Sequence, residues 1–272
     1  MVKKNFIKVF SKLYLALILL FLYAPVLCII IFSFFNTDLF TFKNGFSFEA
    51  YTSIFTSSKS IDLWNAIGNT AFIAVIAATV STVLGTFSAI GIFNLSKRTR
   101  RAVKNINQLP VINSEIVMAV SFMVFFSTFA FPEGYLRLTL AHIAFCTPYV
   151  VLNVMPQLTQ MDPNIYEAAL DLGANPNKAL TKVMLPILKP GIISGFVLSF
   201  TLSMDDFIIT QINKGNTGIE TLSTFIYGDA HRKGMEPFWF AVFSIIFVLI
   251  LTILLVINLK KSSLKENKNE KI

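Results

Sequence analysis

Six long apolar stretches alternate with polar segments along the chain. A transmembrane helix needs about 20 mostly apolar residues to cross roughly 30 Å of hydrocarbon. Each stretch reaches about that length, so the pattern predicts an all-α, polytopic membrane protein with six transmembrane helices. The predicted spans cover residues 13–35, 66–93, 109–131, 138–158, 191–212 and 238–259.

Composition strengthens this prediction. Hydrophobic residues make up 54% of the 272 residues and charged residues only 14%, and mean hydropathy is +0.67. Soluble domains carry about 25% charged residues, and 28 Phe exceed what one soluble core can bury. A soluble globular enzyme and a disordered chain are therefore both excluded.

The charged residues are distributed unevenly between the two sides of the membrane. An even number of spans places both termini on one side, and 17 of the 23 Lys and Arg fall on that side. Because cationic loops stay in the cytoplasm during insertion, we expect both termini to be cytoplasmic, in the cell membrane. The net charge of +8 is then explained by the orientation of the chain in the lipid membrane, and it indicates no nucleic-acid partner.

Three regions follow from the spans. Residues 1–64 hold the cytoplasmic N-terminus, a first transmembrane helix that is retained, and an outer loop. Residues 65–259 form a core with five transmembrane helices and a cytoplasmic loop at 159–190, and residues 260–272 read as a disordered cytoplasmic tail. Trp64 and Trp239 fall near predicted outer ends, where amphipathic rings favour the membrane interface.

The loop between the fourth and fifth spans predicts two short helices. Asx–Pro pairs at 162–163 and 175–176 are typical helix starts. Gly173 is suited to ending the first helix, because glycine adopts positive φ at little cost. Pro186 and Pro190 predict the end of the second helix and the beginning of the fifth span.

The first of these helices has an apolar face beside an acidic pair. Glu167 and Asp171 are four residues apart and therefore neighbours on the helix surface. An amphipathic connector resting on the bilayer is one interpretation, but two acids make an anionic membrane surface unfavourable, so a protein partner is favoured. The apolar face consists of Ile165, Ala168, Ala169 and Leu172.

This loop resembles the EAA loop of ABC importer permeases. The resemblance rests on four short motifs: Glu167-Ala168-Ala169, Leu172-Gly173-Ala174, Leu185-Pro186 and Pro190-Gly191. In that family the loop docks into a cleft of a cytoplasmic ATPase subunit. The resemblance thus implies an ATPase-coupling role for Glu167, Ala168, Ala169, Asp171 and Gly173.

Further segments resemble the second permease subunit of spermidine/putrescine importers. They are LPVINSEIVMAVSF at 109–122, HIAFCTPYVV at 142–151 and SFTLSMDDFIIT at 199–210. The similarity runs over about residues 10–260 and departs from the family pattern at 113–114, where a proline is expected. It implies a type I ABC importer permease fold. The implied partners are a second permease, two copies of the ATPase subunit and an extracytoplasmic polyamine-binding protein.

Three acids interrupt the apolar spans: Glu115, Asp205 and Asp206. A carboxylate at the bilayer centre costs about 2.5–3.5 kcal/mol on insertion scales, so such residues usually serve a transport pathway. On unbroken helices Glu115 would lie about 9 Å and Asp205 about 21 Å from the cytoplasmic end, and a polycation could touch both. Alternatively, Asp206 caps a broken helix and Glu115 pairs with a neighbouring donor. Asp205 is the favoured path residue.

Aromatic and imidazole side chains of the fourth span are weaker candidates. Tyr149, with Phe145, could attract a protonated amine through its ring face, although most of the many aromatics must simply pack. His142 is expected to contact a neighbouring helix by donating to a carbonyl. With His231 in an outer loop, no metal site and no cofactor are expected.

Known catalytic motifs are missing from the sequence. There is no GxxxxGK[ST] phosphate loop, HExxH, CxxC or GxSxG, so we expect no enzyme, with ATP hydrolysed by a separate subunit. The function predicted is the permease half of an ATP-driven polyamine importer. The alternatives are a permease for another small solute and, with less support, a secondary transporter, which would need its own repeats and ion site.

Overall fold

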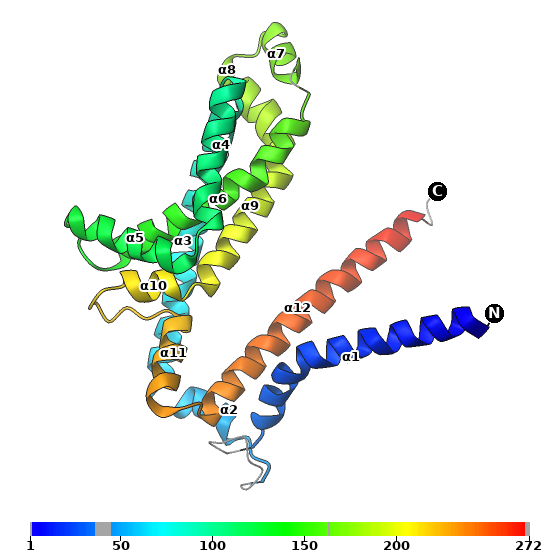
Figure 1. The fold of residues 1–272 in the computed structure, drawn as a ribbon, viewed down its shortest axis with the longest axis vertical. Coiled ribbons are helices and arrows are strands. Elements are labelled where there is room, and N and C mark those ends of the chain that lie inside the picture. The colour runs from blue at the N-terminus through cyan, green and yellow to red at the C-terminus, as the bar shows by residue number, and fades with distance from the viewer. Residues whose placement is uncertain (1, 36–44, 163, 270–272) are drawn as a thin grey trace. The chain divides into compact units, whose positions relative to one another are not determined.

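The computed structural model describes residues 2–35, 45–162 and 164–269, and this part of the chain is almost entirely helical (Figure 1). The only strand-like pairing among these residues is one isolated bridge between Phe35 and Phe46. The all-α prediction is therefore confirmed. The helices are α1 (Val2–Phe32), α2 (Glu49–Thr56), α3 (Ser60–Phe93), α4 (Lys97–Ile112), α5 (Glu115–Thr128), α6 (Tyr135–Gln160), α7 (Asn164–Asp171), α8 (Pro176–Ala179), the π-helical η1 (Leu180–Met184), α9 (Leu185–Asp205), α10 (Ile208–Asn213), α11 (Leu222–Lys233) and α12 (Pro237–Asn269).

Two compact units divide the chain. Unit 1 comprises Met1–Asp62 and Ile226–Ile272, and unit 2 comprises Leu63–Phe225. The sixth predicted span, in α12, falls in unit 1 together with the first. Hydrophobic periodicity shows which residues avoid water and says nothing about which apolar helix packs on which, so the sequence could not assign α12.

Unit 2 is built around α6 and α9, which lie side by side with α3 and α4 (Figure 1). Four small residues on α9 repeat at every fourth position and are buried: Gly191, Gly195, Ser199 and Ser203. A Cβ on Gly191 would lie 2.9 Å from the Asn153 carbonyl oxygen of α6. Small residues at this spacing let two membrane helices approach closely, where dispersion and polar contacts replace the hydrophobic effect.

The third predicted span is not one straight helix. It consists of α4 and α5, which are bent by 104° at the break between them. Asn113 at the break has extended backbone, with ψ of 151°, and Ser114 is extended as well. The depth predicted for Glu115 assumed an unbroken helix from residue 109 and is therefore wrong.

The remaining apolar stretches form helices at the predicted places. Four helices are long and apolar enough to cross a membrane, or five if α4 and α5 are counted as one broken span. Within the residues that could be compared, the apolar part of α12 is Pro237–Thr252, which is too short for this test, so the count of six stays a prediction. The backbone of 260–269 is helical and continues α12. Residues 270–272 lie outside the described residues, and the disordered tail stays a prediction.

Unit 1 joins α1, α2 and α12. Lys59, just before α3, donates to Asp229 (2.6 Å) and Glu236 (2.5 Å). Trp239 is fully buried and donates its indole N–H to Asp229 at 2.7 Å. A buried carboxylate thus provides the partner that the indole N–H needs, and a position of Trp239 near the membrane interface stays a prediction.

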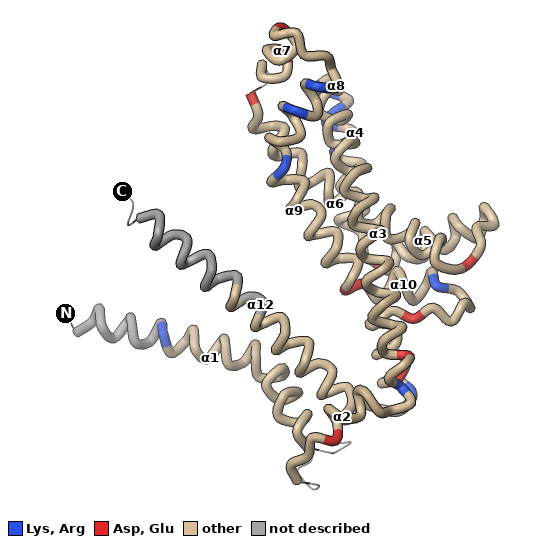
Figure 2. Tube along the Cα trace, turned by 180° about the vertical axis from the view of Figure 1, so that it is seen from behind, with Lys and Arg blue, Asp and Glu red and all other residues tan. Residues whose placement is uncertain are grey.

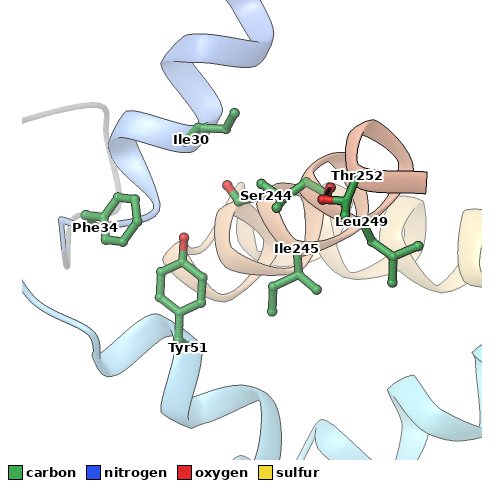
Figure 3. A pocket seen from close by; sticks show the side chains of 8 residues that line it. Ile30, Phe34, Tyr51, Ser244, Ile245, Leu249 and Thr252 are labelled. Atoms are coloured by element: carbon green, nitrogen blue, oxygen red, sulfur yellow. Dashed lines mark hydrogen bonds between the residues drawn. The ribbon is translucent and has the colours of Figure 1, made fainter. Parts of the chain in front are cut away.

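An apolar pocket of about 490 Å³ lies beside α1, α2 and α12 within unit 1 (Figure 3). Ser33 and Tyr51 hydroxyls are 2.7 Å apart near its edge, while the Ser244 hydroxyl that lines it has no hydrogen-bond partner among the described residues. The other lining residues are almost all apolar: Ile30, Phe34, Ile245, Val248, Leu249 and Thr252.

Candidate functional site

The two adjacent aspartates lie where the fifth span breaks. Asp205 is the last residue of α9, Asp206 follows with extended backbone at ψ 131°, and α10 begins at Ile208. The fifth span is therefore broken after Asp205, and the two acids do not lie on one helix.

Asp206 is buried and caps α10. It is 7% exposed; its Oδ1 accepts from the Ile209 N–H at 3.1 Å, and its Oδ2 accepts from both the N–H and the hydroxyl of Thr210 at 2.8 Å. These bonds satisfy backbone donors at a helix start that would otherwise be unpaired in a membrane. The alternative that Asp206 caps a broken helix therefore has direct geometric support.

His142 of α6 forms hydrogen bonds to residues on both sides of this break. Its Nδ1 lies 2.8 Å from Ser203 Oγ and its Nε2 lies 3.1 Å from Thr210 Oγ1. Because the Thr210 hydroxyl proton goes to Asp206, Nε2 is the donor to Thr210. The predicted carbonyl acceptor for His142 is therefore wrong; its partners are hydroxyls, one on each side of the break. Asp206 Oδ2 is 3.6 Å from Nε2.

Asp205 differs from Asp206 in both exposure and hydrogen bonding. Its side chain is exposed, and within the described residues it has no hydrogen bond or ion pair. The arrangement thus separates two carboxylates, one consumed by internal hydrogen bonds and one free to meet a ligand or a partner chain.

Glu115 and Tyr149 lie on the neighbouring helices α5 and α6. Glu115 is the exposed first residue of α5, and Tyr149 is half-buried. The Tyr149 ring packs edge-to-face on Phe145, with centroids 5.4 Å apart. Glu115 has no ion pair among the described residues, so the alternative that a neighbouring donor pairs with it has no support there.

The predicted coupling loop forms the expected first helix, α7. Asp162 Oδ1 accepts from the Asn164 N–H at 2.9 Å, as expected of a helix-starting residue; Pro163 lies outside the described residues. After α7, Gly173 has φ +85°. Glu167, Ala168 and Asp171 are exposed, and Leu172 is 89% exposed. The apolar face predicted on this loop is thus partly uncovered, which favours a protein partner.

The second predicted helix does not end at the prolines. Asn175 caps α8 by accepting from the Lys178 N–H at 2.8 Å, as expected, but α8, η1 and α9 then run on as one helix of 30 residues. Pro186 lacks the N–H and crowds the preceding turn. The π-helical η1 widens the helix just before it, and this accommodates the proline without a break.

A groove of about 710 Å³ lies beside α7 in unit 2. Tyr166 and Glu167 of α7 line it together with Arg100 of α4. Its remaining lining residues come from the ends of α3 and α6 and from α8 and η1: Ile90, Phe93, Asn94, Met161, Pro176, Asn177, Leu180 and Met184.

Three acids between α10 and α12 are each paired internally. Glu220 binds Lys214 at 2.7 Å, and Asp229 and Glu236 share Lys59. Lys214 lies six residues from its partner, whereas Lys59 comes from a distant part of the chain.

The sequence did not identify the polar residues that join α5, α9 and α10. Asn213 is fully buried and donates to the carbonyls of Ala119 and Ile209 at 3.1 and 3.0 Å. Ser203 and Thr210 link both sides of the break to His142. The sequence could have pointed to these residues, because they are polar residues within apolar stretches and recur about one helical turn apart.

Similar proteins were found by sequence. The chain is 33% identical over 224 residues to the putrescine transport system permease protein PotI of Escherichia coli, covering 80% of this chain and 78% of that protein. It is 32% identical over 236 residues to the spermidine/putrescine transport system permease protein PotC of Escherichia coli, covering 86% and 87%.

Solved structures share the fold. A chain from the crystal structure of a bacterial ABC transporter involved in the import of the acidic polysaccharide alginate matches with a TM-score of 0.65 at 16% identity, covering 96% of this chain and 97% of that one. The family model described as "Binding-protein-dependent transport system inner membrane component" matches residues 81–262. The chain is a multi-pass membrane protein that belongs to this family of transport permeases.

Proposed function

We propose that this chain is the permease subunit of an ATP-driven importer and forms half of a translocation path for polyamines. The observation that carries the proposal is the similarity to two polyamine permeases over at least 80% of the chain. The free Asp205 carboxylate at a break in a membrane helix is the chemistry that a cationic substrate needs.

In this proposal the substrate is recognised by a few weak contacts that lie apart from one another. Asp205 and Glu115 supply exposed carboxylates at two helix breaks, and the Tyr149 ring face attracts protonated amines. Transport requires binding that is weak enough to permit release, so single carboxylates serve better than a tight cage. Asp206 acts as the cap that positions Asp205.

Coupling is assigned to α7. Its exposed Glu167, Ala168 and Asp171, with the half-buried Ala169, form a short rigid element that Gly173 ends sharply. Docked into an ATPase subunit, this element would transmit nucleotide-driven closure to α6 and α9. ATP hydrolysis occurs in that separate subunit, so the chain itself is not an enzyme.

The complete transporter contains several chains. One chain lines half of a central path, so a second permease completes it, with two ATPase copies and an extracytoplasmic polyamine-binding protein. The distribution of Lys and Arg supports cytoplasmic termini and places α7 on the same side.

The test is uptake by the reconstituted complex. Vesicles holding both permeases and the ATPase, supplied with binding protein outside and ATP inside, are expected to accumulate radiolabelled putrescine or spermidine. Uptake of a different solute that neither polyamine inhibits would instead support the alternative small-solute permease. Uptake by this chain alone without ATP would support a secondary transporter.

A further inference from the structure

A groove of about 440 Å³ on the first turns of α4 is lined only by polar and cationic side chains. The lining residues are Lys97, Arg100, Arg101, Lys104, Asn105 and Gln108. The groove immediately follows α3, a helix long and apolar enough to span a membrane. Figure 2 shows Lys and Arg gathered at this end of unit 2, near the start of α4 and near α8.

The ion pairs among the described residues involve none of the Lys and Arg of α4. Arg100 is held in place, with its guanidinium 4.8 Å from the Phe93 ring centroid and its Nη2 donating to the Leu95 carbonyl at 3.1 Å. Its Nε has no hydrogen-bond acceptor among the described residues. Several like charges close together on one helix favour a bound anion.

The side chains along one face of α4 change from cationic to apolar. Lys97, Arg101 and Lys104 recur at helical spacing, followed on the same stripe by Gln108 and Ile112. Ile112 is 77% exposed and the adjacent Leu109 is 56% exposed. From Lys104 to Ile112 the helix rises about 12 Å. Cations, then an amide, then uncovered apolar side chains match the order of groups in a phospholipid: phosphate, ester and acyl chain.

We propose that this stripe of α4, residues 97–112, is a binding site for an anionic phospholipid. The phosphate binds Lys97, Arg101 and Lys104, and an acyl chain lies on Leu109 and Ile112. Clusters of four or more Lys and Arg at the cytoplasmic end of a transmembrane helix attract anionic lipids in this way. A soluble phosphate would use the cations and leave the apolar end uncovered.

The experiment measures lipid bound to the full transporter complex in detergent by native mass spectrometry, with dioleoyl phosphatidylglycerol and dioleoyl phosphatidylcholine as probes. The groove variant carries Lys97→Gln, Arg101→Gln and Lys104→Gln. The matched control carries Lys178→Gln, Lys182→Gln and Lys189→Gln, three exposed lysines of the same side that do not line the groove. Both variants lose the same net charge.

The expected result is preferential retention of phosphatidylglycerol by the wild type. Each cation near a membrane surface contributes about fivefold in anionic lipid binding, so the groove variant should weaken it on the order of 100-fold, and the control far less. Ile112→Asn should also weaken it while leaving inorganic phosphate binding unchanged.

Three outcomes would overturn the proposal. Equal phosphatidylglycerol binding in the groove variant and wild type excludes the site. Full competition by inorganic phosphate shows a site for a free anion. Loss of the ATPase subunit from the groove variant, with lipid retention unchanged, shows that this surface belongs to a protein partner.

Discussion

At the scale of single residues, adjacent carboxylates are separated by their hydrogen bonds rather than by their position in sequence. Asp206 accepts three hydrogen bonds and is buried, whereas Asp205 is exposed and has no hydrogen bond to another described residue. A buried carboxylate with satisfied oxygens is a structural element. The exposed carboxylate is the one proposed above to meet the substrate.

Asparagine at the two positions should therefore give different defects. Asp206→Asn replaces one accepting oxygen with a donor facing backbone N–H groups and should cost about 1–3 kcal/mol, because a buried partner is left unsatisfied. Asp205→Asn should leave thermal stability and subunit yield unchanged and reduce polyamine uptake at least tenfold, which corresponds to about 1.4 kcal/mol. Thermal melts and vesicle uptake separate the two. Normal uptake by both variants would remove the main physical support for a cationic substrate.

At the scale of helices, close contact of α6 with α9 and the sharp end of α7 both depend on glycine. Gly191 is needed for space, since its Cβ would approach the Asn153 oxygen and Val154 Cα of α6. Gly173 is needed for conformation, since φ is +85° and nothing lies within 4 Å of its would-be Cβ. The two positions therefore respond to different substitutions.

Gly191→Ala should push α9 away from α6. The atoms it meets are mostly backbone and cannot rotate aside, so overpacking should cost about 1–3 kcal/mol. Gly91→Ala on α3 is the matched control, because nothing lies within 4 Å of its Cβ. Thermal denaturation in detergent should show a lower midpoint only for Gly191→Ala; a shared midpoint would mean that α9 can shift without loss.

Gly173→Val should disrupt ATPase docking more than Gly173→Asn. A β-branched residue is disfavoured at positive φ, at roughly 1–2 kcal/mol, whereas asparagine tolerates this region. Because the site is open, the effect should be confined to the loop and leave the spans folded. Co-purification with the ATPase and transport-coupled ATP hydrolysis are the measurements, and intact coupling in Gly173→Val would contradict the docking assignment.

At the scale of the whole molecule, ion pairs between segments far apart in sequence hold unit 1 together. Lys59 joins the end of the first loop to Asp229 and Glu236, about 170 residues away. Burial lowers the pKa of the Lys59 ammonium, but the hydrogen bonds and charges of the two carboxylates outweigh it, so its pKa is raised above the ordinary 10.5.

The sign of the pH effect follows from this raised pKa. A lysine whose pKa is higher in the folded state contributes its full stability below the unfolded value of 10.5 and loses it as pH rises through the folded value. Lys59→Met should thus lower thermal stability by about the same amount at every pH from roughly 6 to 9, with the difference from wild type closing only in strong alkali. A difference that vanished near neutral pH would show that Lys59 is not the stabilising group.

The sequence by itself determined the helical class, the membrane environment, the places of most spans and the start and end of α7. These are local properties: a run of apolar residues, an Asx before a helix and a glycine after it act through their immediate neighbours. Only the tertiary structure decided that α4 and α5 are bent apart, that α12 joins α1, and that Asp206 rather than Asp205 is buried. Each of these depends on side chains distant in sequence, such as His142 against Ser203 and Thr210, whose meeting no local pattern encodes.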